Sequence, residues 1–476
     1  MRAKLEPALI VAARELRDQF RDWRIIIPVL ILALFFPGLM NFTARQAVNF
    51  VSTYGANIIA ERFIPFLLMI VGFFPITISL VIALESFAGE TERRSIEPLL
   101  SSPLEDWQLY LGKLLASLVT PVAGAYLGIF TYLIGLYTTI GWQADPVFLL
   151  QVVLLTTVQA LVMVAGAVVV STQTTSVRAA NLLASFIVIP IALLIQAEAI
   201  LMFWADFSVL WWIILAEAVV CIMLIRTGLA YFNREHLLGA EIDALNLRLN
   251  WTIFRRAFLG EAHTLPQWLT REIPRTLRSL SVPLAISTLV LIAGLWIGMN
   301  QAQRFNISPE ALNLDALTRL DSGVISGMRS AGFYSLGGAA YVWFHNLRVV
   351  AIATLLGIFS FGAAGLILMM LPLVMLGFLA QVAAGTGITP WTFLAAFTLP
   401  HGFLEYPAMI LSSAVILRLG ATLITPSHGL SLSGAVMRAL AEWARVLLAV
   451  VIPLFFLAAL VEMFITPTTM LMVLGK

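Results

Sequence analysis

Residues 149–171 read LLQVVLLTTVQALVMVAGAVVVS, an apolar run without a charged side chain. An α-helix needs about 20 such residues to cross the hydrocarbon core of a bilayer. The run therefore predicts a membrane-spanning helix. How many runs of this kind the chain contains, and how they are connected, decides its fold.

The composition of the whole chain points the same way. Of its 476 residues, 60% are hydrophobic and only 11% are charged, against about 25% charged residues in a typical soluble domain. A soluble chain of this length cannot hide so much apolar surface in its cores. The composition excludes a soluble enzyme, a disordered protein and a nucleic-acid binder, and it makes membrane lipids the expected surroundings. The single cysteine, Cys221, excludes an intramolecular disulfide and a cysteine-cluster metal site.

The chain contains ten further apolar runs, which makes eleven with the first. Six of the eleven precede a polar, Arg-rich stretch at 227–280, and five follow it. We therefore predict an all-α, polytopic membrane protein with eleven transmembrane helices, arranged as six and five. The stretch 347–383 is either two helices or one broken helix, because glycines and a proline interrupt it. The expected spans are 25–40, 64–84, 114–139, 149–171, 181–204, 207–226, 281–299, 347–363, 364–383, 389–417 and 446–465.

The basic residues predict the orientation of the chain. If the N-terminus lies in the cytoplasm, 21 of the 28 Lys and Arg residues fall in the segments on the cytoplasmic side. Positive charges favour the cytoplasmic side of membrane proteins. We expect a multi-pass protein of the inner (plasma) membrane, with its N-terminus in the cytoplasm and its short C-terminal tail outside.

The N-terminal segment has the pattern of an amphipathic helix. Its apolar residues recur every three or four positions, and charged residues occupy the other faces. Such a helix lies along the membrane surface, either as a plain anchor or as a docking helix for a cytoplasmic partner. The apolar positions are Leu5, Leu9, Ala12, Leu16, Phe20 and Trp23.

The loop at 85–113 combines charges with large apolar side chains. Its core reads GETERRSIEPLLSSP over residues 89–103, and it closes at Gly112-Lys113. Charge runs are usually solvated faces. The apolar residues among these charges indicate instead a surface that another protein grips.

This loop resembles the cytoplasmic loop of type-2 ABC exporter permeases, which has an acidic pair, a short "GT/S-L-E-x-L-L" core, a Ser/Thr-Pro turn and a closing Gly-Lys. Arg94 departs from the pattern, since the family usually has glycine there. The resemblance extends over about residues 1–235 and implies a permease that couples to an ABC ATPase. The implied coupling residues are Glu90, Glu92, Arg93, Glu97, Leu100, Pro103, Trp107 and Lys113.

The chain lacks the G-x-x-x-x-G-K-[ST] motif, so it cannot bind ATP through a P-loop. We therefore expect a separate ATPase subunit, no cofactor on this chain and no enzymatic activity of its own. The family form has two permease halves, so six spans imply a homodimer or a partner permease.

A polar motif lies inside the expected span at 389–417. It reads LPHGFLEYPA over residues 399–408 and places His401 and Glu405 four residues apart, on one helix face. Ionisable groups at membrane depth are costly and usually pair or line a cavity. Two interpretations remain open, a His–Glu hydrogen bond in a Pro-bent helix and a proton or substrate site. A metal site is not expected, because two ligands are too few and no H-E-x-x-H motif is present.

The motif resembles the Pro-His-Gly-x-x-Glu-x-Pro-Ala core of the stage II sporulation protein M family. The likeness covers about residues 260–470 and includes the earlier segment FHNLR at 344–348. Members named for sporulation act in membrane complexes that remodel the cell wall. The polar residues that the resemblance singles out are Asn346, Pro400, His401, Gly402, Glu405 and Pro407.

Other acidic residues fall within the expected spans, namely Glu198, Glu217, Glu442 and Glu462. Glu217 lies near the middle of its span, where a charge is most costly. We expect it to face a dimer interface or the transport path, or to form a buried pair with a neighbouring helix.

Together these features predict a permease-like module at 1–235, a cytoplasmic linker at 236–280 and a sporulation-protein-like membrane module at 281–476. The predicted function is that of the permease subunit of an ATP-driven exporter. Two alternatives remain. One is a non-transporting scaffold for cell-envelope remodelling factors, which would use the outer loop at 301–345. The other is an intramembrane enzyme that uses His401 and Glu405.

Overall fold

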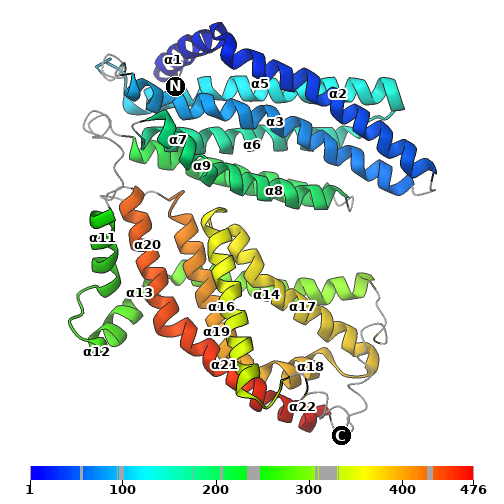
Figure 1. Cartoon of the computed structure of the whole chain (residues 1–476), viewed down its shortest axis with the longest axis vertical. Coiled ribbons are helices and arrows are strands. Elements are labelled where there is room, and N and C mark those ends of the chain that lie inside the picture. Colours follow the sequence, from blue (N-terminus) through cyan, green and yellow to red (C-terminus); the bar gives the residue numbers. More distant parts are fainter. Residues whose placement is uncertain are drawn as a thin grey trace. The chain divides into compact units, whose positions relative to one another are not determined.

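The computed structural model of the chain is built from helices (Figure 1). Every regular element within the described residues is helical, and eleven helices there are long and apolar enough to cross a membrane. Each corresponds to one predicted span, so the expected all-α polytopic fold is confirmed. The residues described are 2–53, 57–93, 95, 101–174, 176–203, 207–232, 247–305, 309, 330, 332–425 and 432–474.

The chain divides into two compact units. The first unit comprises residues 1–245 with 424–426, and the second comprises 246–423 with 427–476. The long helices of the first unit are α1 (Arg2–Arg21), α2 (Trp23–Thr53), α3 (Asn57–Glu92), α5 (Asp106–Ile140), α6 (Pro146–Thr172), α7 (Val177–Leu183), α8 (Ser185–Phe203) and α9 (Leu210–Tyr231).

In the first unit α3 packs against α2, α5 and α6, and α6 packs against α9. The helix α1 lies along α5, and Gly112 allows this close approach. A Cβ atom at Gly112 would lie 2.7 Å from the carbonyl oxygen of Ala8 and 2.8 Å from Cβ of Val11. Backbone atoms cannot move aside for a side chain there, so the closing glycine of the 85–113 loop is what lets α1 sit on α5.

The predicted apolar face of α1 is partly left uncovered by the first unit, with Leu5, Ala12 and Leu16 half-buried. Leu9 and Phe20 are more than half exposed, whereas Ala8 and Val11, on another stripe of the helix, are buried against α5. An uncovered apolar face beside a charged one is the form of a helix that lies in a membrane interface. Trp23, expected at the end of this helix, begins α2 instead.

The second unit begins with short helices and continues with long ones. They are α11 (Leu247–Leu259), α12 (Leu265–Gln267), the π-helix η2 (Trp268–Glu272), α13 (Ile273–Ser279), α14 (Ser281–Phe305), α16 (Leu336–Ile358), α17 (Ala363–Ala383), α18 (Pro390–Phe397), α19 (Leu399–Ala421), α20 (Leu432–Val446), the π-helix η6 (Leu447–Val451), α21 (Ile452–Phe464) and α22 (Thr466–Leu474).

The helices α14 and α17 make the closest crossing in this unit, through small residues of the kind that let membrane helices approach. A Cβ atom at Gly298 would lie 1.9 Å from the carbonyl oxygen of Val374, and one at Gly377 would lie 2.1 Å from that of Leu295. The backbones therefore touch at positions where any larger residue would push them apart.

The structure decides between the two forms predicted for 347–383 and changes the form of one other span. The stretch 347–383 is two helices, because Phe361 and Gly362 have positive φ angles of 55° and 99° and reverse the chain between α16 and α17. The expected span at 389–417 is broken at Thr398, which is not helical, and α19 begins afresh beside Pro400. Proline suits a first helical turn because its missing N–H has no partner there anyway.

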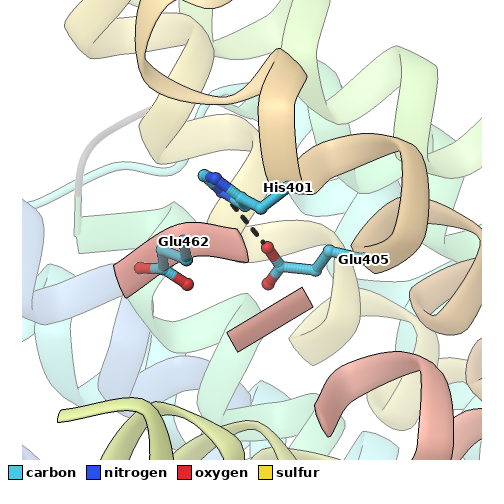
Figure 2. A group of neighbouring side chains, drawn as sticks. All are labelled: His401, Glu405 and Glu462. Carbon is cyan, nitrogen blue, oxygen red and sulfur yellow. Dashed lines mark ion pairs between the residues drawn. The ribbon is translucent and has the colours of Figure 1, made fainter. Parts of the chain in front are cut away.

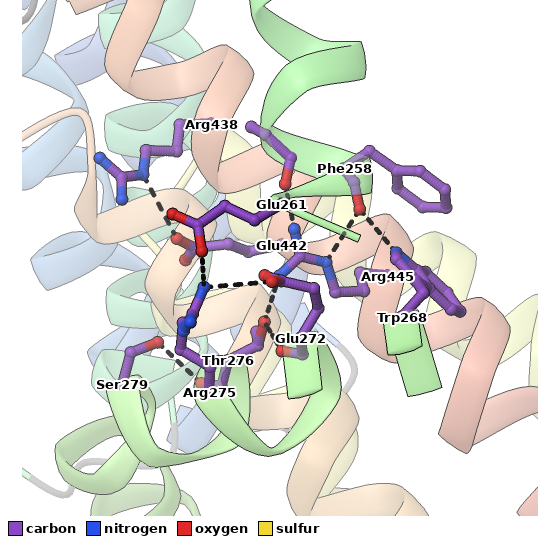
Figure 3. Close-up of polar contacts among 11 residues, drawn as sticks. Phe258, Glu261, Trp268, Glu272, Arg275, Thr276, Ser279, Arg438, Glu442 and Arg445 are labelled. Carbon is purple, nitrogen blue, oxygen red and sulfur yellow. Dashed lines mark hydrogen bonds and ion pairs between the residues drawn. The ribbon is translucent and has the colours of Figure 1, made fainter. Parts of the chain in front are cut away.

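The described part of the expected linker, residues 247–280, is largely helical and belongs to the second unit. Arg445 of α20 is buried and donates to the carbonyl oxygens of Ala257 and Phe258, at the end of α11, and to Oγ1 of Thr276 at 2.6 Å (Figure 3). The last carbonyls of a helix lack partners within it, so Arg445 satisfies them. Its guanidinium also lies 3.7 Å from the carboxylate of Glu272, which is itself buried.

Candidate functional site

The first candidate site surrounds Lys113 of α5. Its side chain is 1% exposed, and its Nζ lies 2.9 Å from Oε1 of Glu90 on α3 and 3.2 Å from Oε1 of Glu15 on α1. The same Nζ lies 5.3 Å from the centre of the Phe87 ring, an attractive cation–π geometry. One ammonium group therefore joins α1, α3 and α5. We refer to Glu15, Phe87, Glu90 and Lys113 as the Lys113 centre.

Glu92 connects the end of α3 to the start of α7. Its Oε2 accepts a hydrogen bond from the backbone N–H of Val177 at 2.8 Å, and the Oγ of Ser176 caps the same helix by accepting from Ala179. The N-terminus of a helix carries a partial positive charge and unpaired N–H groups, so a carboxylate is stabilised there.

The remaining coupling residues are more peripheral. Arg93 is exposed and pairs with Glu85 at 3.8 Å. Pro103 is exposed, and the indole N–H of Trp107 donates to the carboxylate of Glu105 at the start of α5. Glu97 and Leu100 lie outside the described residues.

The sequence pattern had therefore selected Glu90 and Lys113 without showing that they meet. It missed Glu15 of the N-terminal helix. One pattern in the sequence pointed to Glu15. It follows the apolar Val11 by four residues, so both lie on the same stripe of the helix, and the structure packs this stripe on α5.

The second candidate site lies where α16, α19 and α21 meet in the second unit. His401 and Glu405 of α19 face one another, with Nε2 of the imidazole 3.4 Å from Oε2 of the carboxylate. Glu462 of α21 lies beside them (Figure 2), and one ligand atom from each of the three residues falls within 4.8 Å of the others. We refer to His401, Glu405 and Glu462 as the His401 centre.

Two neighbours hold this centre in place. The amide of Asn346 on α16 donates to Oε1 of Glu405 at 3.4 Å. The Nδ1 atom of His401 lies 2.9 Å from Oγ1 of Thr466, the first residue of α22. The predicted motif residues Asn346, His401 and Glu405 thus share one site.

The other motif residues shape α19. Pro400 lies in its first turn and Pro407 in its interior. Gly402 is buried, and a Cβ atom there would lie 2.8 Å from the ring of Tyr406. These residues set the helix that carries His401 and Glu405.

A cavity of about 350 Å³ opens onto the His401 centre. Its wall mixes polar and apolar side chains from α16, α17, α19 and α21. Its polar lining includes His345, Asn346, His401, Glu405 and Glu462.

Glu217 of α9 belongs to neither centre. Its side chain is buried, and neither carboxylate oxygen has a hydrogen-bond partner within the described part of the chain. The buried Glu198 of α8 interacts with it electrostatically and accepts a hydrogen bond from Nε2 of Gln159 at 2.8 Å. The two buried acids thus come from α8 and α9 of the first unit.

Sequence models of two known families match the chain. The sequence model described as ABC-2 family transporter protein matches residues 9–299, more than half of the chain. The chain belongs to the ABC-2 transporter family. The Lys113 centre, Glu92 and Glu217 all lie within this ABC-2 match, which runs past the first unit and through α11–α13 into α14.

A second model, described as Stage II sporulation protein M, matches residues 284–467 and includes the whole His401 centre. Both resemblances seen in the sequence are thereby confirmed. The search of curated proteins and that of solved structures gave no match. The ABC-2 chain is therefore a multi-pass membrane protein whose C-terminal part carries a second family's motif.

Proposed function

We propose that this chain is the permease subunit of an ATP-driven ABC exporter. Membership of the ABC-2 family supports a transporter-like membrane protein, and the Lys113 centre supports the coupling role. In this proposal a separate ABC ATPase binds the segment between α3 and α5 together with the membrane-surface helix α1. Two permease units, as a homodimer or with a partner permease, line the transport path.

The observation that carries the proposal is the position of Lys113. Glu90 and Lys113 lie near the two ends of the segment between α3 and α5, so movement of this segment would displace both. Because the ammonium of Lys113 also pairs with Glu15, the displacement would extend to α1. Glu92 passes the same displacement to the start of α7. A tightly packed, charge-paired joint of this kind moves as one body rather than deforming.

The orientation belongs to the same proposal. An ATPase acts in the cytoplasm, so the Lys113 centre would lie at the cytoplasmic end of the first unit. This agrees with the distribution of Lys and Arg, which places the N-terminus and the 85–113 loop on that side of the plasma membrane.

The test is to isolate the chain with its ATPase in mild detergent and to measure the ATPase rate with and without the permease. Glu92→Arg and Glu97→Arg are expected to uncouple the ATPase. At Glu92 the reversed charge would face the positive end of α7, and at Glu97 it would reverse a charge of the proposed ATPase-binding segment. Glu261→Arg is a matched control, since this exposed glutamate lies in the second unit. Full coupling in both loop variants, with the ATPase still bound, would contradict the proposal.

The match to the sporulation protein favours a second candidate, a membrane scaffold that recruits cell-envelope remodelling factors. The segment between α14 and α16, most of which lies outside the described residues, would be the recruiting loop. Deleting 310–329 should then abolish capture of a cell-wall hydrolase and leave ATPase coupling intact. The exporter proposal alone expects no hydrolase to be captured.

A further inference from the structure

One histidine and two glutamates converge at the cavity of about 350 Å³ in the second unit. His401 and Glu405 come from α19, and Glu462 comes from α21. One ligand atom from each lies within 4.8 Å of the other two. The sequence had offered two of these ligands and so predicted no metal site, but the fold supplies the third.

The hydrogen bonds around His401 allow a neutral ring whose Nδ1 carries the proton. Nδ1 lies 2.9 Å from Oγ1 of Thr466, which can accept that proton while its own hydroxyl donates to the carbonyl oxygen of Val461 at 3.3 Å. In this tautomer the lone pair of the imidazole lies on Nε2, the nitrogen that faces Glu405.

In this tautomer the acceptor Nε2 faces a carboxylate oxygen of Glu405 at 3.4 Å, and Glu462 adds a second carboxylate. Within the described residues no Lys or Arg forms an ion pair with either glutamate. Partly buried carboxylates are either protonated or paired with a cation, and a metal ion among the three side chains would pair with both.

We propose that the His401 centre binds a divalent transition-metal ion, with Zn²⁺ as the best fit. One imidazole nitrogen and two carboxylate oxygens form a donor set that suits zinc, whereas Mg²⁺ and Ca²⁺ prefer oxygen ligands alone. Ligands about 2.1 Å from a tetrahedral zinc lie about 3.4 Å apart. The His401–Glu405 separation already has this value.

The surroundings match those of known metal sites. A metal-binding histidine usually donates its other ring N–H to a neighbouring acceptor, which fixes the ring, and Thr466 accepts that bond here. Asn346 orients Glu405 in the same way. Two neutral partners thus hold two of the three ligands without competing for the metal.

The site leaves one coordination position open to the cavity of about 350 Å³. Three protein ligands with an open fourth position are typical of catalytic rather than structural zinc sites. The cavity would therefore admit a further oxygen-donor ligand, such as water or a carboxylate or phosphate group of a substrate. This inference does not depend on the exporter proposal, because it uses only residues of the second unit.

The decisive experiment measures zinc binding by the purified full chain in mild detergent after treatment with a chelator. We expect one Zn²⁺ per chain with a dissociation constant below about 1 μM. His401→Gln and Glu462→Gln should each weaken binding by more than about 100-fold, since each removes a direct ligand. His345→Gln is the control, because His345 lines the same cavity but pairs with Arg348 and lies outside the ligand group.

A second variant covers the case in which a ligand substitution disrupts folding. Asn346→Ala keeps all three ligands and should weaken zinc binding by about 10- to 100-fold. Co²⁺ in place of Zn²⁺ should give the intense visible absorption of a four-coordinate site in the wild type and in His345→Gln. Absence of zinc from the wild type, or a full equivalent in His401→Gln, would overturn the proposal.

Discussion

The Lys113 centre and the His401 centre each contain two glutamates, but they differ in the residue that accompanies these glutamates. Each brings two glutamates from different helices together in a partly buried place. In the first unit the chain supplies the cation, the ammonium of Lys113. In the second unit the third residue is a histidine, whose Nε2 lies 3.4 Å from a carboxylate oxygen of Glu405. The first centre is complete as a joint between helices, whereas in our proposal the second takes its cation from outside the chain.

The difference also appears in what surrounds each centre. Lys113 is packed against Phe87 and is 1% exposed, so its charge is fully committed to Glu15 and Glu90. Both centres line a cavity, of about 200 Å³ at the Lys113 centre and of about 350 Å³ at the His401 centre. What separates them is the internal cation: a centre whose charges are paired within the chain suits the transmission of movement, and one without a Lys or Arg partner among the described residues suits ligand binding.

The strongest test of the contrast is Lys113→Met. Removing the cation leaves Glu15 and Glu90 facing each other, and breaking a buried ion pair in this way costs about 3–5 kcal/mol. The apparent melting temperature of the detergent-solubilised protein should fall sharply. The combination with Glu15→Gln and Glu90→Gln should recover much of the loss. A single variant as stable as the wild type would show that Lys113 does not hold the three helices together.

Addition of zinc tests the His401 centre. A ligand that binds only the folded state at about 100 times its dissociation constant stabilises that state by about 2.7 kcal/mol. Zn²⁺ should therefore raise the melting temperature of the wild type and of Lys113→Met by a similar free energy, but not that of His401→Gln. Zinc stabilisation that survives in His401→Gln would place the metal elsewhere.

Glu217 differs from both centres. It is a buried acid that has no ion-pair partner within the described residues and lines none of the described cavities. Burial penalises the charged form of a carboxyl group, and Glu198 adds repulsion. Glu217→Gln keeps the shape and removes the charge, so we expect the protein to become more stable by about 1 kcal/mol, measured by thermal unfolding. A clear loss of stability would mean that the carboxylate has a favourable partner, such as a second copy of the chain.

The smallest effect is expected at Arg93, whose pair with Glu85 is exposed. Surface ion pairs contribute about 0–1 kcal/mol, because solvent screens them. Arg93→Ala should leave the melting temperature nearly unchanged, in contrast to Lys113→Met. A large loss of stability would show that charge near the 85–113 loop matters for folding irrespective of burial.

Much of the fold could be predicted because each span is a local property. The run at 149–171 and its ten counterparts correspond one to one with helices. The element ends were less predictable. Leu336 begins a helix eleven residues before the expected span at 347, since lipid does not need to cover every residue of a helix that continues past the bilayer.

The sites were predicted in part. Glu90, Lys113, His401 and Glu405 were selected by motif, and the structure joins them in two pairs. Glu15 and Glu462 were visible only as isolated acids. Each lies more than 50 residues from the partner it joins, and the packing of separate helices decides such distances rather than spacing along the chain.

The sequence by itself determined that the chain is an all-α membrane protein with eleven spans, because the transfer of about 20 apolar residues into lipid depends only on those residues. It also determined the two families, whose motifs are short and contiguous. Only the tertiary structure decided where the charges meet. The glycine contacts between α1 and α5 bring Glu15 to Lys113, and the packing of α21 against α19 brings Glu462 to His401. A charge in a low-dielectric interior acts over a few ångströms, so its partner cannot be known until the helices are packed.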